Sequence, residues 1–192
     1  MVIIMIAKRF LIVLSSPSGG GKTTVAQYLL KKYKQLKFSI SATTRPQRHN
    51  EQNGKDYFFI TKEEFEKKIK NNEFVEYEQI FDNYYGTLKS QIQKALADGI
   101  FLIFDVDVKG AIALKKAFPK NTALIFLVPP SLEELEKRLR KRATESNEEL
   151  EKRLKRAKME FEFQNEFDYV IINDKLNTTL ATVDNIVSKM II

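Results

Sequence analysis

Residues 16–23 have the sequence Ser-Pro-Ser-Gly-Gly-Gly-Lys-Thr, and this octapeptide is the strongest indicator of fold class in the 192-residue chain. It follows the phosphate-binding loop (P-loop) pattern, except that Ser16 stands where the first glycine is expected. Glycines can adopt positive φ, so successive N–H groups can converge on phosphate oxygens. In that pattern Lys22 contacts the β- and γ-phosphates and the Thr23 hydroxyl ligates Mg²⁺. The alternative is an ordinary glycine-rich turn that caps a helix.

The segments on either side of this loop favour the nucleotide-binding interpretation. Residues 10–14 form a continuous apolar run, which is typical of a strand buried on both faces of a parallel sheet. Residues 23–33 have helical periodicity, with Val25, Ala26, Leu29 and Leu30 on one face. Strand, glycine-rich turn and helix make the first βα unit of a nucleotide-binding α/β fold.

Buried runs and helical patterns alternate in most of the remaining chain. The predicted strands are residues 101–106, 123–128 and 169–172, with 37–41 as a fifth, and the predicted helices are 108–118, 132–142, 148–163 and 178–190. This alternation predicts a P-loop NTPase core: a parallel five-stranded sheet flanked by helices. We assign residues 1–40, 90–137 and 158–192 to this core.

Two segments differ from the core in composition. Residues 41–89 contain Pro46, Gly54, Gly86 and several aromatic residues, with short strand patterns at 57–60 and 74–77 and an amphipathic helix at 62–71, and we expect an inserted α+β lobe. Residues 138–153 are mostly charged and polar, so few apolar side chains can anchor them. We expect a lid over residues 138–157.

Composition restricts the possible chemistry. The chain is 43% hydrophobic and 30% charged, as in a soluble globular protein, and it has no cysteine, which excludes thiolate catalysis. The single histidine, His49, lies in a polar stretch and is expected in an exposed loop. Residues 2–7 are too short to span a membrane, and no signal-peptide cleavage site follows them, so we expect a cytoplasmic protein. The net charge of +7 suits a polyanionic substrate or a nucleic acid.

A possible acceptor site lies in the inserted lobe. Arg45 and Arg48 flank Pro46, and two guanidinium groups on a stiff turn can clamp a phosphate dianion. The alternative is a solvated basic turn. Tyr57 and Tyr85 could add uncharged hydroxyl donors to the phosphate site.

Two carboxylates, one in this lobe and one in the core, fit a guanine base. Guanine presents N1–H and N2–H₂ donors on one edge, so Glu76 and Asp107 are suitable acceptors, and adenine would be repelled there. The hydroxyls of Ser41 and Thr87 could contact the O6/N7 edge. The alternatives are that Glu76 is a surface residue and that Asp107, like Asp105, only ends a strand and caps a helix.

With these motifs the sequence closely resembles the guanylate kinase family from about residue 10 to residue 187. The family patterns match at residues 16–23, at Ser-x-Ser-x-Thr-Thr-Arg-x-x-Arg (39–48), Asn-Gly-Lys-Asp-Tyr (53–57), Phe-x-Glu (74–76), Asn-Tyr-Tyr-Gly-Thr (83–87) and Asp-x-Asp-x-x-Gly (105–110). Two departures are Ser16 and the lid sequence Arg-Ala-Thr-Glu at 142–145, where the family often has Arg-Gly-Thr-Asp.

The resemblance implies roles for particular residues. ATP would contact Ser16, Pro17, Ser18, Gly19, Gly20, Gly21, Lys22, Thr23, Thr24 and, at the adenine side, Asn173. GMP would contact Ser41, Arg45, Arg48, Tyr57, Glu76, Tyr85, Thr87 and Asp107. Catalytic groups would be Lys22, Arg45, Arg138, Arg142 and Arg153, with Mg²⁺ bound directly by Thr23 and through water by Asp105. For the last three arginines, the alternative is a solvated helix face paired with Glu at i+4.

The expected activity is transfer of the γ-phosphoryl group of Mg·ATP to GMP, and also to dGMP, in purine nucleotide metabolism. Three alternatives remain: a non-catalytic guanylate-kinase-like module, a kinase for another small phosphorylated acceptor, and a nucleic-acid-binding protein. The intact Lys22 and Thr23 argue against the first, Glu76, Tyr85 and Asp107 together argue against the second, and the lack of a stacking or recognition motif argues against the third. The sequence leaves open whether the protein is a monomer or a homodimer.

Overall fold

The computed structural model describes residues 10–17, 20–80, 82–141 and 147–191. Its centre is a five-stranded sheet in the order β2-β7-β1-β8-β9, in which every pairing is parallel. The strands are β1 (Leu11–Ser15), β2 (Leu36–Phe38), β7 (Phe101–Asp105), β8 (Thr122–Val128) and β9 (Tyr169–Ile172). The predicted sheet is confirmed. The fifth strand begins at Leu36, one residue before the predicted start, and ends at Phe38.

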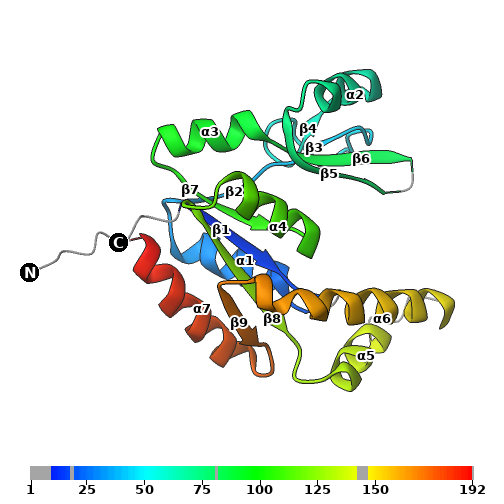
Figure 1. Cartoon of the computed structure of the whole chain (residues 1–192), viewed down its shortest axis with the longest axis vertical. Coiled ribbons are helices and arrows are strands. Elements are labelled where there is room, and N and C mark those ends of the chain that lie inside the picture. Colours follow the sequence, from blue (N-terminus) through cyan, green and yellow to red (C-terminus); the bar gives the residue numbers. More distant parts are fainter. Residues whose placement is uncertain (1–9, 18–19, 81, 142–146, 192) are drawn as a thin grey trace, which may run out of the picture.

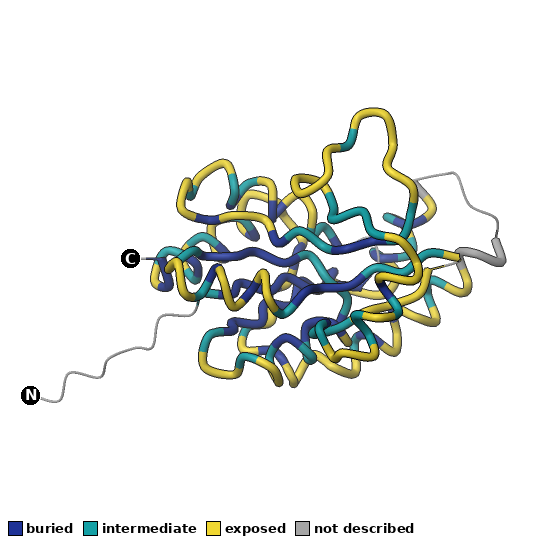
Figure 2. The backbone as a smooth tube through the Cα atoms, turned by 90° about the horizontal axis from the view of Figure 1, so that it is seen from above, coloured by how far each residue is buried: buried dark blue, intermediate teal, exposed yellow. Residues whose placement is uncertain are grey.

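Helices cover both faces of this sheet (Figure 1). Successive residues of a strand point to opposite faces. Ile12 and Leu14 therefore pack in the cluster with α1 (Lys22–Lys32) and α7 (Leu176–Ile191), and Leu11 and Val13 pack in the cluster with α3 (Lys89–Ala97) and α4 (Val108–Ala117). Figure 2 shows the buried strands running between exposed outer turns. The continuous apolar runs of the strands are explained by burial on both faces.

The lobe that was predicted between residues 41 and 89 has a sheet of its own, in the order β4-β3-β6-β5. Its elements are β3 (Ala42–Thr43), β4 (Phe58–Phe59), α2 (Lys62–Lys70), β5 (Phe74–Ile80) and β6 (Asn83–Leu88). Phe65 of α2 is fully buried and stacks on Phe74, with ring centroids 4.2 Å apart, and on Tyr84, at 5.1 Å. These aromatic contacts give the lobe a small core separate from that of the main sheet.

Two further helices, α5 (Leu132–Lys141) and α6 (Asn147–Glu162), lie at the lower right in Figure 1, and a short 3₁₀ turn, η1 (Phe163–Glu166), follows α6. Leu135, Leu139 and Ala157 are buried between the two helices. Arg138 lies on α5 and Arg153 on α6, whereas Arg142 lies outside the described residues.

Some elements were not predicted from the sequence. α3 and β6 were assigned no secondary structure, and β3 is too short to give a period-2 pattern. In the part of the chain that the structure describes, the helices are all too short or too polar to cross a membrane.

Candidate active site

The loop after β1 holds Lys22 in place through Ser16. The Lys22 Nζ donates to the Ser16 carbonyl oxygen at 3.0 Å and to Ser16 Oγ at 3.2 Å. Gly20 N donates to the Pro17 carbonyl at 2.9 Å, which closes the turn before α1. Ser16 thus has a role of its own at the position where the pattern has glycine. Ser18 and Gly19 lie outside the described residues, and Thr24 is exposed in the first turn of α1.

Lys22 lies in a partly desolvated environment in which three carboxylates and the Arg156 guanidinium act on its charge. Burial lowers the pKa of its ammonium group, and the charges of Asp105, Glu160 and Asp107 oppose that shift. A partly desolvated cation gains further stabilisation when another anion approaches it. The position suits an ammonium group that receives nucleotide phosphates.

Thr23 and Asp105 bring two oxygen ligands together beside Lys22. The Thr23 hydroxyl donates to Asp105 Oδ2 at 3.0 Å, so the side chain at the end of β7 meets the start of α1. Among the described residues no group of three or more His, Cys, Asp or Glu side chains could hold a metal by itself. A hydroxyl and a carboxylate fit Mg²⁺ that arrives with phosphate oxygens as further ligands.

Asn173, at the end of β9, supports the phosphate loop from behind. Its side-chain amide donates to the Gly20 carbonyl at 2.7 Å, and its Oδ1 accepts from the Thr179 hydroxyl at 2.9 Å. Gly21 has φ of +92°, and a Cβ atom there would lie 2.5 Å from Asn173 Nδ2. Glycine at position 21 is therefore required both by backbone conformation and by space.

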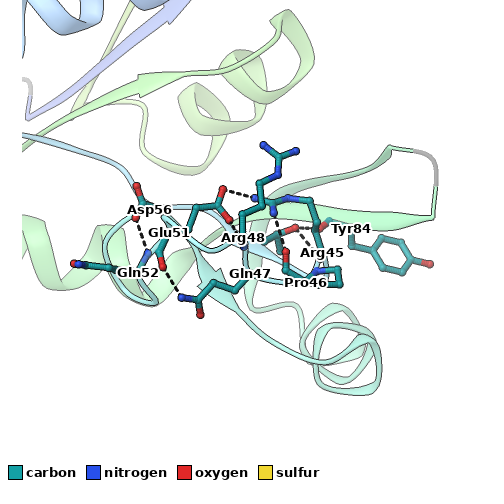
Figure 3. Close-up of polar contacts among 9 residues, drawn as sticks. Arg45, Pro46, Gln47, Arg48, Glu51, Gln52, Asp56 and Tyr84 are labelled. Atoms are coloured by element: carbon teal, nitrogen blue, oxygen red, sulfur yellow. Dashed lines mark hydrogen bonds and ion pairs between the residues drawn. The ribbon is translucent and has the colours of Figure 1, made fainter.

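The basic turn of the lobe is organised by Glu51 (Figure 3). Arg45 Nη2 donates to Glu51 Oε1 at 2.7 Å, and the backbone N–H of Arg48 donates to Glu51 Oε2 at 2.8 Å. The Arg45 guanidinium also donates to the Pro46 carbonyl at 2.8 Å. The hydrogen bond from Arg45 holds the pKa of the Glu51 carboxyl below its usual value, so this carboxylate is charged at neutral pH.

Aromatic rings surround the Arg45 guanidinium. Its central carbon lies 5.5 Å from the ring centroid of Tyr57 and 5.7 Å from that of Phe59. Tyr57 and Tyr85 meet edge to face, with centroids 6.1 Å apart. The structure therefore brings together Arg45, Tyr57 and Tyr85, which are far apart in the sequence. Ser41 lies at the start of β3, where its carbonyl accepts from Phe58 N at 2.9 Å.

Glu76 and Thr87 face each other across the antiparallel pair β5–β6. The Thr87 hydroxyl donates to Glu76 Oε1 at 2.5 Å. Burial raises the pKa of Glu76, and the negative charge of Asp107 raises it further. Glu76 and Asp107 line the same cavity of about 860 Å³, together with Glu78, Arg156 and Glu160. The two carboxylates that were predicted to recognise guanine thus share one cavity.

Asp107 also caps a helix, as one of the alternatives supposed. Its Oδ1 accepts from Gly110 N at 2.8 Å at the start of α4, and its Oδ2 accepts from Arg156 Nη2 at 3.0 Å. Capping uses one oxygen and leaves the other directed toward α6. The two interpretations of Asp107 are therefore compatible.

The predicted lid arginines occupy different places. Arg138 Nη1 donates to the carbonyl of Asn173 at 2.9 Å, and its Nε donates to Glu134 at 2.9 Å, so it has both a contact near the phosphate loop and a helical ion pair at i,i−4. Arg153 is half-buried on α6. Arg142 lies outside the described residues.

Four residues of the site were not singled out from the sequence: Glu51, Arg156, Glu160 and Thr179. Glu51 follows Arg48 by three residues, the spacing at which a side chain can return to a turn, and this was the available signal. Arg156 and Glu160 lie among many charged residues on α6, and only the fold separates them from that background.

The chain is similar to known proteins along nearly its whole length. The guanylate kinase family model matches residues 8–190. The chain is 48% identical to a guanylate kinase of Chlorobaculum tepidum, over 90% of this chain and 89% of that protein, and 45% identical to one of Rickettsia bellii, over 94% of each. The crystal structure of guanylate kinase from Anaplasma phagocytophilum has a TM-score of 0.70 to this structure at 32% identity, and the match covers 95% of this chain and 86% of that one. With the family model matched over nearly the whole length and relatives this similar, the chain belongs to the guanylate kinase family.

Proposed function

We propose that this protein transfers the γ-phosphoryl group of Mg·ATP to GMP, and also to dGMP, giving ADP and the diphosphate. The observation that carries the proposal is the meeting of the two half-sites at the end of β7. Asp105 contacts Thr23 of the phosphate loop, and Asp107, two residues later, shares a cavity with Glu76 of the lobe. A donor nucleotide and an acceptor base would therefore lie on either side of one short segment.

The phosphate of GMP is already ionised at neutral pH, so the reaction needs positioning and charge stabilisation rather than a general base. Lys22 would bind the transferred phosphoryl group, and Arg45, Arg48, Tyr57 and Tyr85 would hold the acceptor phosphate. Glu51 accepts a hydrogen bond from Arg45 and holds its guanidinium beside the rings of Tyr57 and Phe59. Arg138, Arg142 and Arg153 would add positive charge from the α5–α6 side.

Mg²⁺ would be held by Thr23 directly and by Asp105 through water. Bound there with ATP, the ion neutralises charge on the phosphate oxygens. The ligand types on this chain fit it, because both offer hard oxygen atoms at adjacent positions. The remaining ATP contacts would come from residues 16–24, with Asn173 supporting the loop.

Selection of guanine would come from Glu76 and Asp107, which accept hydrogen bonds from N1–H and N2–H₂. Ser41 and Thr87 would serve the O6/N7 edge. We propose that residues 41–89 form the GMP-binding lobe and residues 138–157 the lid, and that both close over the core and exclude water, because access of water would lead to hydrolysis of ATP. We place the reaction in the cytoplasm.

The variant Arg45→Ala tests the assignment of the acceptor phosphate site. Loss of charge-assisted hydrogen bonds to a dianion should weaken GMP binding by about 10- to 100-fold, and ATP binding should change by less than about twofold. Calorimetric titration with each nucleotide gives both constants. Lys94→Ala, which removes a cation from an exposed pair with Asp98, is the control and should change neither. Equal weakening of GMP and ATP would contradict the proposed site.

A further inference from the structure

Arg156 of α6 joins two carboxylates at the guanine end of the cavity. Its Nη2 donates to Asp107 Oδ2 at 3.0 Å, and its Nε donates to Glu160 Oε1 at 3.0 Å. The guanidinium therefore connects α6 to Asp107, the residue that precedes α4. No part of the proposed phosphoryl transfer requires this contact, so its position needs a separate explanation.

The contact determines how Asp107 presents its oxygens. Gly110 N donates to Oδ1 at 2.8 Å, and Arg156 donates to Oδ2, so donors on two different elements fix the plane of the carboxylate. Each carboxylate oxygen can accept more than one hydrogen bond. Asp107 thus keeps acceptor capacity for a ligand while Gly110 N and Arg156 set its orientation.

Glu160 holds the other end of Arg156. The side chain of Glu160 is only 12% exposed, and its Oε2 has no hydrogen-bond partner within the described residues. A buried carboxylate of this kind needs its cationic neighbour, which is Arg156 at i,i−4. Glu160, Arg156 and Asp107 are thus in contact in that order along one wall of the cavity.

The cavity wall is rich in negative charge at this place. Glu76, Glu78, Asp107 and Glu160 all line it, and Arg156 is in direct contact with two of them. Without Arg156, Asp107 would keep one backbone donor and would lose its cationic partner next to the charge of Glu76. Rotation of Asp107 away from the other carboxylates would then be favoured.

We propose that Arg156 is a positioning residue for base selection, which holds Asp107 in the orientation that accepts from the 2-amino group of guanine. This inference rests on the proposed function, because it assumes that Asp107 contacts the base. Arg156 itself touches no reacting atom and acts through Asp107.

The test compares GMP with IMP, which keeps N1–H and O6 but has no 2-amino group. With saturating Mg·ATP, Arg156→Gln should raise KM for GMP about tenfold, the equivalent of about 1.4 kcal/mol, with kcat within about twofold of wild type. KM for IMP should change by less than about twofold, so the ratio of kcat/KM for GMP over IMP should fall about tenfold. Arg156→Lys keeps the charge with a different geometry and should give an intermediate ratio.

Arg140→Gln is the matched control, because Arg140 makes the same kind of helical ion pair with Glu136 on α5, with the Arg140 side chain 57% exposed. Arg140→Gln should leave KM and kcat for both GMP and IMP unaffected. The inference would be overturned if Arg156→Gln lowered kcat/KM equally for GMP and IMP, or if it left their ratio unchanged. If Arg156→Gln does not fold, the ratio of kcat/KM for GMP over IMP in Arg156→Lys decides in the same way. Wild-type protein that phosphorylates no GMP would instead defeat the proposed function, and the inference with it.

Discussion

At the scale of single residues, Glu76 combines a proposed functional role with an energetic cost. Burial raises its pKa above the usual 4.5, and the charge of Asp107 adds to the shift. The folded protein therefore binds a proton at Glu76 more tightly than the unfolded chain does. Its contribution to the free energy of unfolding is greatest below pH 4.5 and declines as the pH rises through the raised pKa.

Glu76→Gln should consequently make the protein more stable at pH 7, because a neutral amide replaces a partly buried charge and its oxygen can still accept from Thr87. Below pH 4.5 the difference in free energy of unfolding between variant and wild type should disappear. Denaturant unfolding at the two pH values measures this, and GMP turnover should be lost in the same variant. A variant with wild-type stability at pH 7 would show that Glu76 is not desolvated.

Asn173 illustrates a residue whose position was anticipated but whose contacts were not. The sequence suggested an adenine-side role, and that role stays a prediction. In the structure its side chain bonds Gly20 and Thr179 beneath the phosphate loop.

Asn173→Ala should lower the free energy of unfolding by about 1–3 kcal/mol, because the Gly20 carbonyl loses a buried donor. It should also raise KM for ATP while leaving KM for GMP within twofold, since the loss is confined to the phosphate loop. Asn177→Ala, at an exposed position of α7, is the control. Equal increases in both KM values would argue against a local role at the loop.

At the scale of elements, α5 and α6 pack against each other through a small cluster of apolar side chains. Leu139 is 3% exposed and packs with Leu135 and Ala157, and Phe161 of α6 joins this cluster to one of the two clusters on the main sheet. Helices stabilised by so few apolar contacts should open locally more often than the core strands do.

Leu139→Ala should therefore destabilise this pair by about 2–5 kcal/mol, as for other buried leucines. Hydrogen exchange should become faster in α5 and α6, while protection in β1 and β8 stays as in wild type. Leu132→Ala removes a leucine that is 37% exposed on the same helix and should have little effect. Faster exchange throughout the core sheet would mean that α5 and α6 unfold only together with it.

The elements missed from the sequence have a common physical cause. α3 buries only Ile92 and Ala95, so its apolar face is too narrow to give a clear helical pattern. β6 contains Gly86 and polar residues, and its strand conformation depends on pairing with β5 and β3. In contrast, β1, β7 and β8 are buried on both faces, and their apolar runs identified them without tertiary information.

At the scale of the whole molecule, one part of the site could be predicted from local sequence, and the other part is brought together only by the fold. The phosphate loop is contiguous, and local spacing with glycine conformation was sufficient to predict it. The cavity that contains Glu76, Asp107 and Arg156 is built from β5, the start of α4 and α6, which only the fold brings together. The partnership of Glu51 with Arg45 was missed because it depends on the path of a turn without regular structure.

The most direct measurement is a coupled assay of ADP formation from Mg·ATP with GMP, AMP, UMP, CMP and dTMP at equal concentrations. The account predicts rapid turnover with GMP alone, because only guanine presents two adjacent donors to Glu76 and Asp107. Protein that binds ATP but turns over none of these monophosphates, or that prefers AMP, would contradict the assignment of the acceptor site.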